Sequence, residues 1–383
     1  MAHHNTVFAQ LLKYIPRHEF ETLANQHHTG RRFRTASRWS QFVAMALAQL
    51  SGRTSLRDIV ANLSVQAHRL YHLGGAVLSR SNLSRINEHK PYALYEALFG
   101  KLLARCQALA PRHGFRFRNK LYSLDASTVD LCLSLFPWAN FRTTKGAIKL
   151  HVGLDHDGYL PEFVSLTDGK TTDIEAGRIL AFPTGSIVVY DRGYTDYGWY
   201  NQLTQKGIFF VTRLKKNAQY RVVKRQKVAR HQGLSCDQII EFTGSQVRKK
   251  CPIRLRRIGY HDRETGKHYV FLTNHFDLSA KTIADIYKQR WQIELFFKWI
   301  KQNLKIKTFL GTSKNAVMTQ IWIALCVYLL LAFIKFQSTL DKSMRQILQL
   351  LQINLFEKRD LYTLLRGDPP DNNWVNTNQL AFL

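Results

Sequence analysis

The chain has 383 residues, with 55 Lys and Arg against 27 Asp and Glu, a net charge of +28 and 45% hydrophobic residues. The apolar content excludes a largely disordered chain, and the length favours two or three domains. So positive a charge on a folded chain is typical of a protein with a polyanionic partner. Five scattered cysteines without a Cys-x-x-Cys pair predict reduced thiols rather than a zinc site or a disulfide framework.

Neither a secretion signal nor a membrane span is expected. The first twenty residues contain no uninterrupted apolar stretch, and the longest apolar run in the chain covers residues 321–334. A run of this length falls short of the about 20 residues that span a membrane and is more typical of a buried helix.

The basic residues are unevenly distributed. Residues 1–120 carry 18 basic and 5 acidic side chains and residues 213–257 carry 14 and 2, whereas residues 121–212 carry 7 and 10. Carboxylates gathered within a basic protein need a reason, and binding of a divalent metal is one. The pattern predicts two polyanion-binding segments flanking an acidic core.

Residues 1–118 are expected to form a helical domain that binds DNA. Apolar residues recur there at helical spacing, as in Phe42, Met45, Ala46 and Leu50. Two short helices, at 55–63 and 81–89, could form a pair like a helix-turn-helix. Arg80 and Arg85 in the second are suited to phosphates and base edges. The alternative is an ordinary helical bundle with solvated arginines.

Residues 119–340 are expected to form a mixed α/β domain, because the apolar period changes to that of strands. Expected strands cover residues 121–126, 146–154, 159–166, 186–190 and 208–212, and a helix covers 196–206. The basic, strand-prone residues 213–275 are interpreted as a β-stranded insertion. A long helix over about 280–303 and an apolar helix over about 315–336 follow. Residues 341–383 are expected to be a helical segment and a tail.

The helix expected over residues 280–303 carries Tyr287, Arg290, Glu294 and Lys301 in the spacing Y-x2-R-x3-E-x6-K. At about 100° per residue, these positions fall within an arc of about 60°, beside an apolar stripe. The helix therefore combines a core contact with one polar strip. Taken alone, the carboxylate could belong to a plain salt bridge, from Arg290 to Glu294 or from Glu294 to Lys298.

Two aspartates in other segments favour a functional site. Asp125 ends an apolar strand, where a carboxylate is costly unless it is paired or bound to metal. Asp191 follows the strand 186–190, and the carboxyl ends of strands are where sites form. Together with Glu294, they predict a site for two Mg²⁺ ions that act on phosphodiesters.

Other aspartates are weaker candidates. Asp130 lies five residues after Asp125 and therefore on the opposite face of the strand. Asp155, Asp157, Asp168 and Asp173 fall in expected turns or loops and are interpreted as solvated.

These residues resemble those of a known family. The order Asp125, Asp191, Glu294, with Asp191 in a D-R-G-Y turn and a complete Y-x2-R-x3-E-x6-K helix, is similar to that of the DDE transposases of bacterial insertion sequences. Within these, the chain resembles family four, which has a β-stranded insertion before the glutamate. The resemblance covers roughly residues 1–340, and the stretch P-R-H-E at 16–19 is similar to a domain at the front of such transposases.

The resemblance implies an RNase H-like mixed-sheet catalytic domain with a β-rich insertion, preceded by an all-α DNA-binding domain. It implies that Asp125, Asp191 and Glu294 are catalytic and bind Mg²⁺, for which Mn²⁺ can substitute. Expected DNA contacts are Tyr287, Arg290, Lys301, Lys298, Arg192, Arg80 and Arg85. Expected partners are double-stranded DNA, as terminal inverted repeats and target, and a second copy in a synaptic homodimer, with no membrane. The expected location is the bacterial cytoplasm, at the nucleoid.

In this family, water nicks the element end, and the freed 3′-OH attacks the opposite strand to give a hairpin, which is reopened before joining to target DNA. Relatives hold the hairpin by flipping a base onto a Trp in or near the insertion. The tryptophans here are at positions 39, 138, 199, 291, 299, 322 and 374, and none lies in 213–275. Candidate replacements are Phe242, Tyr260, Tyr269 and Phe271. Trp291 is another, although its position near the core favours a structural role.

Two other functions are compatible with these residues. A catalytically silent DNA-binding regulator derived from such an enzyme would bind without cutting, but the intact triad argues against it. A related RNase H-fold nuclease would cut without joining, but it would have no need for the extra N-terminal domain or the Y-R-E-K strip.

Overall fold

The structure is a computed structural model that describes residues 5–31, 36–142, 145–338 and 341–369. Contacts divide the chain into two compact units. One comprises Met1–Ala110 and Ile300–Leu383, and the other comprises Pro111–Trp299. This division differs from the boundaries expected above, because residues 300–340 group with the N-terminal helices rather than with the sheet.

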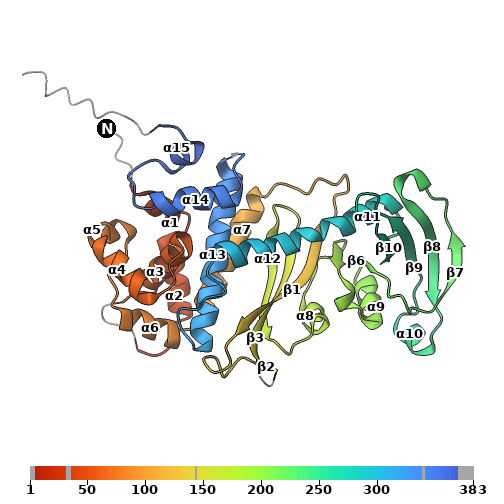
Figure 1. The fold of residues 1–383 in the computed structure, drawn as a ribbon, viewed down its shortest axis with the longest axis horizontal. Helices are drawn as coiled ribbons and strands as arrows, with labels where there is room; N and C mark the ends of the chain where they lie inside the picture. The colour runs from red at the N-terminus through yellow and green to blue at the C-terminus, as the bar shows by residue number, and fades with distance from the viewer. Residues whose placement is uncertain (1–4, 32–35, 143–144, 339–340, 370–383) are drawn as a thin grey trace, which may run out of the picture. The chain divides into compact units, whose positions relative to one another are not determined.

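The first unit is helical (Figure 1). Before the sheet in the chain come α1 (Val7–Leu12), α2 (Arg17–Gln26), α3 (Arg38–Ser51), α4 (Leu56–Val65), α5 (Ala67–Leu70), α6 (Arg80–His89) and α7 (Ala93–Leu109). After it come α13 (Lys314–Ser338), α14 (Met344–Asn354) and α15 (Leu361–Arg366).

Helix α13 explains why the C-terminal residues join this unit. It is apolar on every side and packs against α3, α6 and α7. By length and hydropathy it is the one described helix that could cross a membrane, yet 94% of its most apolar stretch is buried within the protein. A helix apolar all round is expected in the centre of a bundle, which agrees with the buried helix predicted there.

The pair of helices predicted to resemble a helix-turn-helix has a longer connection. Helices α4 and α6 are in contact, but α5 and a 3₁₀ turn (Tyr71–Leu73) lie between them. A helix-turn-helix has a turn of about 3–4 residues, so this connection corrects that prediction. Arg80 and Arg85 are exposed on α6, where a DNA contact remains a proposal.

The second unit is built on one ten-stranded mixed sheet with the order β2-β3-β1-β5-β6-β10-β9-β8-β7, and β4 pairs with β3. The first strands are β1 (Leu121–Leu131), β2 (Asn140–Arg142), β3 (Lys145–Asp155), β4 (Leu160–Asp168), β5 (Ile187–Tyr190) and β6 (Phe209–Arg213). The helices among them are α8 (Asp173–Ile179) and α9 (Tyr197–Gln205). The mixed α/β architecture is as predicted.

The basic segment 213–275 continues this sheet. It contains β7 (Tyr220–Arg225), β8 (Leu234–Phe242), α10 (Ser245–Lys250), β9 (Leu255–His261) and β10 (His268–Thr273). Strand β10 pairs with β6, so the predicted β-stranded insertion widens the central sheet. Arg256 and Asp237 hold β9 to β8 through two hydrogen bonds of 2.7 and 2.9 Å, and both side chains are only 4% exposed.

Alternation along the strands divides the apolar side chains between two faces. Tyr122, Leu124, Val188, Tyr190 and Phe210 pack with α9 on one face. Leu121, Ile187, Val189 and Val211 pack with α11 (Ala280–Gln289) on the other. Odd-numbered positions of β1 and β5 therefore face α11.

The long helix predicted over 280–303 is broken. Helix α11 ends at Gln289, α12 (Trp291–Asn303) begins two residues later, and Arg290 lies between them. The N–H of Arg290 bonds to the carbonyl of Tyr287, and the N–H of Ile293 bonds to that of Arg290. In both bonds the N–H reaches the carbonyl three residues earlier, as in a 3₁₀ turn, rather than four residues earlier, as in an α-helix. The prediction of one continuous helix over 280–303 is therefore wrong at Arg290.

Candidate active site

The sheet register places two of the predicted acids side by side. Strands β1 and β5 are parallel neighbours, and Leu124 pairs with Tyr190. Asp125 is the next residue of β1 and Asp191 directly follows the last residue of β5, and adjacent strands lie about 4.8 Å apart. Asp125 is an odd-numbered position of β1 and therefore belongs to the face covered by α11.

Arg290 connects these aspartates to the predicted glutamate. Its Nη2 lies 2.5 Å from Oε1 of Glu294, and its Nη1 lies 3.9 Å from Oδ2 of Asp125. The i,i+4 salt bridge considered as an alternative does form, but the same guanidinium also reaches Asp125 on the sheet. The side chain of Arg290 is 15% exposed, so it acts as a largely buried cation within a group of carboxylates.

The electrostatics of Asp125 show how crowded these acids are. Burial raises the pKa of Asp125 to about 6, while the Ala126 N–H and Arg290 lower it and the charges of Asp191 and Glu294 raise it. Burial lowers the pKa of Arg290, but Tyr287, Glu294 and Asp125 outweigh it, so that pKa is raised overall. The site therefore holds carboxylates that repel each other around one cation.

The turn after β5 fixes Asp191. Its Oδ1 accepts a hydrogen bond of 2.7 Å from the N–H of Gly193, which caps the 3₁₀ turn Arg192–Tyr194. A Cβ at Gly193 would lie 3.0 Å from Oδ1 of Asp191 and 3.5 Å from Oδ2 of Asp173. Both carboxylates therefore lie near Gly193, and a side chain at this position would crowd that of Asp191.

Asp173 is a site residue that the sequence reasoning missed. It was interpreted as solvated, but its Oδ1 lies 2.6 Å from Nζ of Lys149 and 3.8 Å from Nδ1 of the buried His151. Burial, followed by the charge of Lys149, lowers the pKa of His151 to about 4, so the imidazole is neutral at pH 7. Lys149 and His151 are two residues apart on β3, so they share one face of the strand. Two basic residues on one face of an expected strand were the signal in the sequence that an acidic partner was needed there.

Asp155 was also interpreted as solvated, and this is wrong. Its side chain is fully buried, 2.6 Å from Nζ of Lys120, which also lies 2.8 Å from Asp157. Asp155 ends β3 opposite Tyr122 of β1, so its carboxylate is part of the sheet rather than of the following turn. Asp130 is exposed on β1, away from the acids described above.

The other predicted site residues differ in exposure. Tyr287 is 9% exposed, packs on Phe271 and lies beneath Arg290, whose guanidinium is 5.7 Å from its ring. Lys298 is exposed on α12, and Lys301 lies about two turns after Glu294, beyond the boundary of the sheet unit. Arg192 follows Asp191, and its buried Nε has no hydrogen-bond partner among the described residues.

The aromatic candidates for base stacking differ in exposure, and Tyr260 and Tyr269 of the insertion are half-buried. Phe242 and Phe271 are 3% and 2% exposed and belong to the two apolar cores of the sheet. Trp291 is 58% exposed and directly follows Arg290. The expectation that Trp291 has a structural role in the core is therefore wrong.

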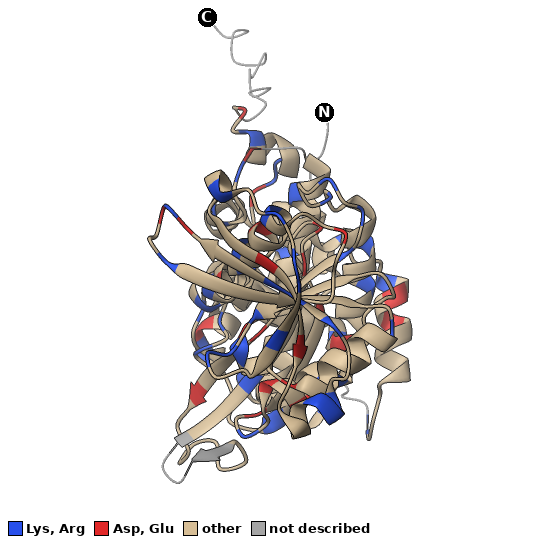
Figure 2. Cartoon of the chain, turned by 90° about the vertical axis from the view of Figure 1, so that its right-hand side faces the viewer, with Lys and Arg blue, Asp and Glu red and all other residues tan. Residues whose placement is uncertain are grey.

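In the described parts of the chain, no three His, Cys, Asp or Glu side chains stand close enough together to hold a metal ion. Arg290 occupies part of the space between Asp125 and Glu294. The donor set, all carboxylate oxygens, is nevertheless the one that Mg²⁺ and Mn²⁺ prefer. Figure 2 shows acidic residues interspersed with Lys and Arg on strands, helices and loops.

Comparison with known proteins identifies the family. Residues 117–330 match the family model described as the transposase DDE domain, and residues 3–76 match a domain of unknown function (DUF4372). A protein of Sinorhizobium fredii named as transposase y4zB is 33% identical over 75% of this chain and 80% of its own length. A protein of Geobacillus stearothermophilus named as a transposase for insertion sequence element IS5377 is 30% identical over 66% of this chain and 67% of its own length.

More distant relatives have the same kind of name. The transposase for insertion sequence element IS231E of Bacillus thuringiensis subsp. finitimus is 21% identical over 91% of this chain and 85% of its own length. Among solved structures, a synaptic complex of piggyBac transposase with hairpin DNA gives a TM-score of 0.45 at 11% identity, over 95% of this chain and 80% of that one. The DDE domain implies an RNase H-like fold, in agreement with the mixed sheet predicted from the sequence.

Proposed function

The chain belongs to the DDE transposases of insertion sequences, and we propose that Asp125, Asp191 and Glu294 are its catalytic acids. The observation that carries this proposal is the pairing of β1 with β5, which places Asp125 beside Asp191. Arg290 then links Glu294 to Asp125. The three acids come from separate segments, in an order similar to that of the family.

The three acids would hold Mg²⁺, with Mn²⁺ as a substitute. Divalent metal is general in this family. Burial, with a smaller contribution from the charges of Asp191 and Glu294, raises the pKa of Asp125, and a bound cation would favour its charged form. When bound, a metal pair activates the attacking oxygen and stabilises the leaving oxygen in an in-line displacement at phosphorus. Binding would compete with Arg290 for the oxygens of Asp125 and Glu294.

The guanidinium of Arg290 would be suited to hold a phosphate beside the cut. A planar guanidinium donates two parallel hydrogen bonds to phosphate oxygens. Buried Tyr287 supports Arg290 from below. Arg192, Lys298 and Lys301 supply further positive charge along the turn after β5 and along α12.

For the hairpin step we assign the stacking role to Trp291. Its ring is largely exposed, and it is the neighbour of Arg290, whereas Phe242 and Phe271 are buried. A base extruded near the cut could stack on this ring with about 1–3 kcal/mol of stabilisation. A Trp291→Ala variant should still nick the first strand but accumulate that nick instead of forming hairpin.

The remaining parts of the chain suggest how the ends are bound. Residues 1–118 would act as the DNA-binding domain, with Arg80 and Arg85 of α6 on phosphates or bases of the terminal inverted repeat. Residues 213–275 carry a strong positive charge that suits a second contact. Two copies would pair two element ends before joining them to target DNA, in the bacterial cytoplasm at the nucleoid.

The test is strand cleavage of a labelled duplex that carries the DNA end flanking this gene. The wild-type protein should give a nick, then hairpin and joined products, with Mg²⁺ but not with Ca²⁺. Glu294→Gln should bind the duplex and cut at least about a hundredfold more slowly. Glu264→Gln is a matched control, because Glu264 is exposed and pairs only with Lys288 among the described residues.

The other outcomes point to other functions. Unchanged cleavage by Glu294→Gln would refute the assignment of the triad. Binding without any Mg²⁺-dependent product would favour a silent regulator. Cleavage without joining would favour a nuclease.

A further inference from the structure

The turn that carries Asp191 is supported by helix α8. The helix packs against the 3₁₀ turn Arg192–Tyr194. The ring of Tyr194 lies so close to Gly177 of α8 that a Cβ on this glycine would be 3.2 Å from it. Gly177 is therefore a position of close approach, where a larger residue would push the helix away from the turn. The place of α8 thus bears directly on the place of the Asp191 turn.

Asp173, the first residue of α8, lies at the same turn. Its Oδ2 and the Oδ1 of Asp191 are 3.5 and 3.0 Å from the position that a Cβ on Gly193 would take. The two carboxylates therefore flank one glycine, and their oxygens are no further apart than the sum of these distances. Burial raises the pKa of Tyr194, and the charges of Asp173 and Asp191 are among those that raise it further, in agreement with two acids near one ring.

Lys149 compensates the charge of Asp173. Its Nζ lies 2.6 Å from Oδ1 of Asp173 and 3.3 Å from the carbonyl oxygen of Thr171, so it contacts both the helix and the segment that leads into it. The side chains of Lys149 and Asp173 are 18% and 30% exposed, so solvent screens their attraction only in part. Lys149 belongs to β3, which pairs with β1 and β4. The ion pair therefore ties the start of α8 to the sheet.

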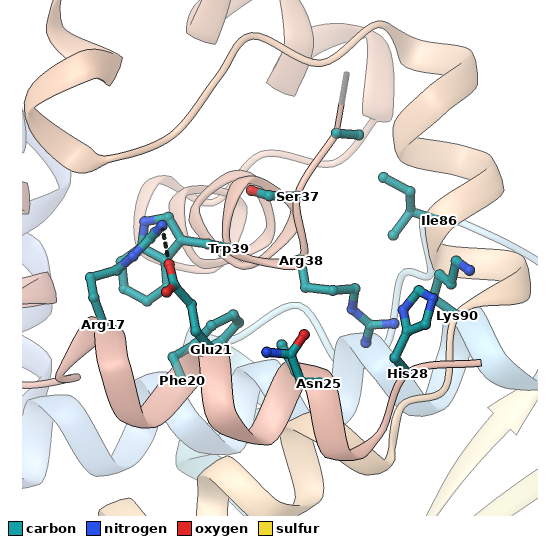
Figure 3. Close-up of a pocket in the computed structure, with 12 residues that line it drawn as sticks. Arg17, Phe20, Glu21, Asn25, His28, Ser37, Arg38, Trp39, Ile86 and Lys90 are labelled. Atoms are coloured by element: carbon teal, nitrogen blue, oxygen red, sulfur yellow. Dashed lines mark hydrogen bonds and ion pairs between the residues drawn. The ribbon is translucent and has the colours of Figure 1, made fainter. Parts of the chain in front are cut away.

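A buried lysine can also serve the fold alone, and Lys90 of the helical unit, labelled in Figure 3, is an example. It is 5% exposed and donates hydrogen bonds of 2.6 Å to the carbonyls of Thr29 and Arg31. Both carbonyls belong to the segment between α2 and α3, so Lys90 fixes a connection of the backbone. Lys149 differs, because its partner is a side-chain carboxylate beside a proposed catalytic acid.

We propose that the ion pair of Lys149 and Asp173 positions the Asp191 turn for metal binding and cleavage. The pair keeps α8 against the turn, and Lys149 offsets a negative charge that would otherwise stand uncompensated beside Asp191. A displacement of about 1 Å at a reacting group can cost about a hundredfold in rate. Both residues act through Asp191, so they are positioning residues, and the inference rests on the proposed role of Asp191 as a catalytic acid.

Removing one member of the pair at a time separates position from charge. Lys149→Met and Asp173→Asn both untie α8 from β3, so both should slow cleavage at saturating Mg²⁺ at least about tenfold. Their effects on charge are opposite, because Lys149→Met leaves a carboxylate uncompensated and Asp173→Asn leaves an ammonium uncompensated. Mn²⁺ should therefore bind at least about threefold more tightly to Lys149→Met than to the wild type, and at least about threefold more weakly to Asp173→Asn.

Three control variants show whether the ion pair itself is responsible. Lys149→Arg keeps a cation within reach of Asp173, so its cleavage rate and Mn²⁺ affinity should stay within about threefold of wild type. Arg178→Met breaks a second ion pair of α8, with Asp196 at 2.7 Å, and should change neither quantity. Lys90→Met removes a buried lysine of the other unit and should lower the unfolding temperature without changing Mn²⁺ affinity.

The experiment has two readouts on the full chain. Mn²⁺ affinity is measured without DNA, from the electron paramagnetic resonance signal of the free ion, and cleavage is measured on the labelled duplex at saturating Mg²⁺. Slow cleavage by Lys149→Met and Asp173→Asn, with shifts of Mn²⁺ affinity in opposite directions, supports the proposal. Wild-type rates in both variants, shifts in the same direction, or an equal loss in Arg178→Met would overturn it.

Asp191→Asn, measured in parallel, separates this proposal from the assignment of the acids. If Asp191→Asn cleaves DNA and binds Mn²⁺ as the wild type does, the proposed role of Asp191 is wrong. If Asp191→Asn loses both properties while Lys149→Met and Asp173→Asn behave as wild type, only the positioning role is wrong.

Discussion

Replacing Asp125 with Asn should stabilise the metal-free protein at neutral pH. Asp125 is held in a place where its charge is unfavourable, since burial is the main cause that raises its pKa to about 6, and Asp191 and Glu294 add to it. Asparagine has nearly the same shape without the charge, and its oxygen can keep the 2.8 Å hydrogen bond from the Ala126 N–H.

The size of the effect follows from the shift in pKa. The pKa rises from an ordinary 3.8 to about 6, and each unit corresponds to about 1.4 kcal/mol, so the charged form costs roughly 2–3 kcal/mol of folding free energy at pH 7. Below pH 3.8 the carboxyl is neutral in both states and costs nothing. As the pH rises from about 4 to 6, the unfolded chain loses this proton first and the native state loses stability. Above about pH 6 the full penalty applies.

The assay is thermal unfolding in EDTA between pH 4 and 8. At about 2–4 °C per kcal/mol for a unit of this size, Asp125→Asn should raise the unfolding temperature by roughly 4–12 °C at pH 7.5, and the gain should vanish near pH 4. Asp130→Asn removes a charge from an exposed position of the same strand and should change little. A variant less stable than wild type at pH 7.5 would refute the argument.

Two further changes test the surroundings of the site. Gly193→Ala should slow strand cleavage about tenfold or more without weakening DNA binding, because the new Cβ would lie 3.0 Å from the carboxylate of Asp191. Cleavage and gel-shift assays measure the two effects. A normal cleavage rate would show that Asp191 has room to move. Asp237→Asn should lower the free energy of unfolding by about 3–5 kcal/mol, because the substitution leaves the charge of Arg256 buried without a counter-charge. A denaturant titration measures this loss. A loss below about 1 kcal/mol would contradict the prediction.

Magnesium should reverse part of the cost at Asp125. A ligand that binds only the folded state adds stability that grows with its concentration, about 2.7 kcal/mol at a hundred times the dissociation constant. Mg²⁺ should therefore raise the unfolding temperature of the wild type more than that of Asp125→Asn. Equal shifts in both proteins would mean that Asp125 does not bind the metal.

The fold and the two aspartates could be predicted because both depend on local patterns. Short apolar runs such as 187–190 mark buried strands, and the residues just after them mark one edge of the sheet. The expectation that Asp125 ends its strand is wrong, because β1 continues to Leu131. Asp191 does follow β5, and the pairing of Leu124 with Tyr190 brings it level with Asp125. The β-stranded insertion could also be predicted from local apolar patterns. Its pairing with the central sheet, through β10 and β6, could not, because it depends on long-range contacts.

The errors fall where a tertiary contact decides the outcome. Asp155 looks like a turn residue, but Lys120 compensates its charge and allows the strand end to be buried. Lys149 and Asp173 lie 24 positions apart. They meet because β3 pairs with β4 and α8 begins shortly after β4. Helix α13 was assigned to the sheet domain by its place in the chain, whereas its apolar surface is buried against helices.

Arg290 shows how one of these errors bears on the chemistry. A regular helix from 280 to 303 would keep Arg290 within an unbroken ladder of backbone bonds, but the tight turn ends α11 there and starts α12 at Trp291. The guanidinium then reaches both Glu294 and Asp125, and the indole of Trp291 remains exposed. Without Arg290 the acids would repel each other with no compensating charge, and the cost already worked out for Asp125 would increase. The break in the helix is therefore compatible with two needs of a phosphodiester site: acids kept together before metal arrives, and a cation and an aromatic ring at the position of the cut.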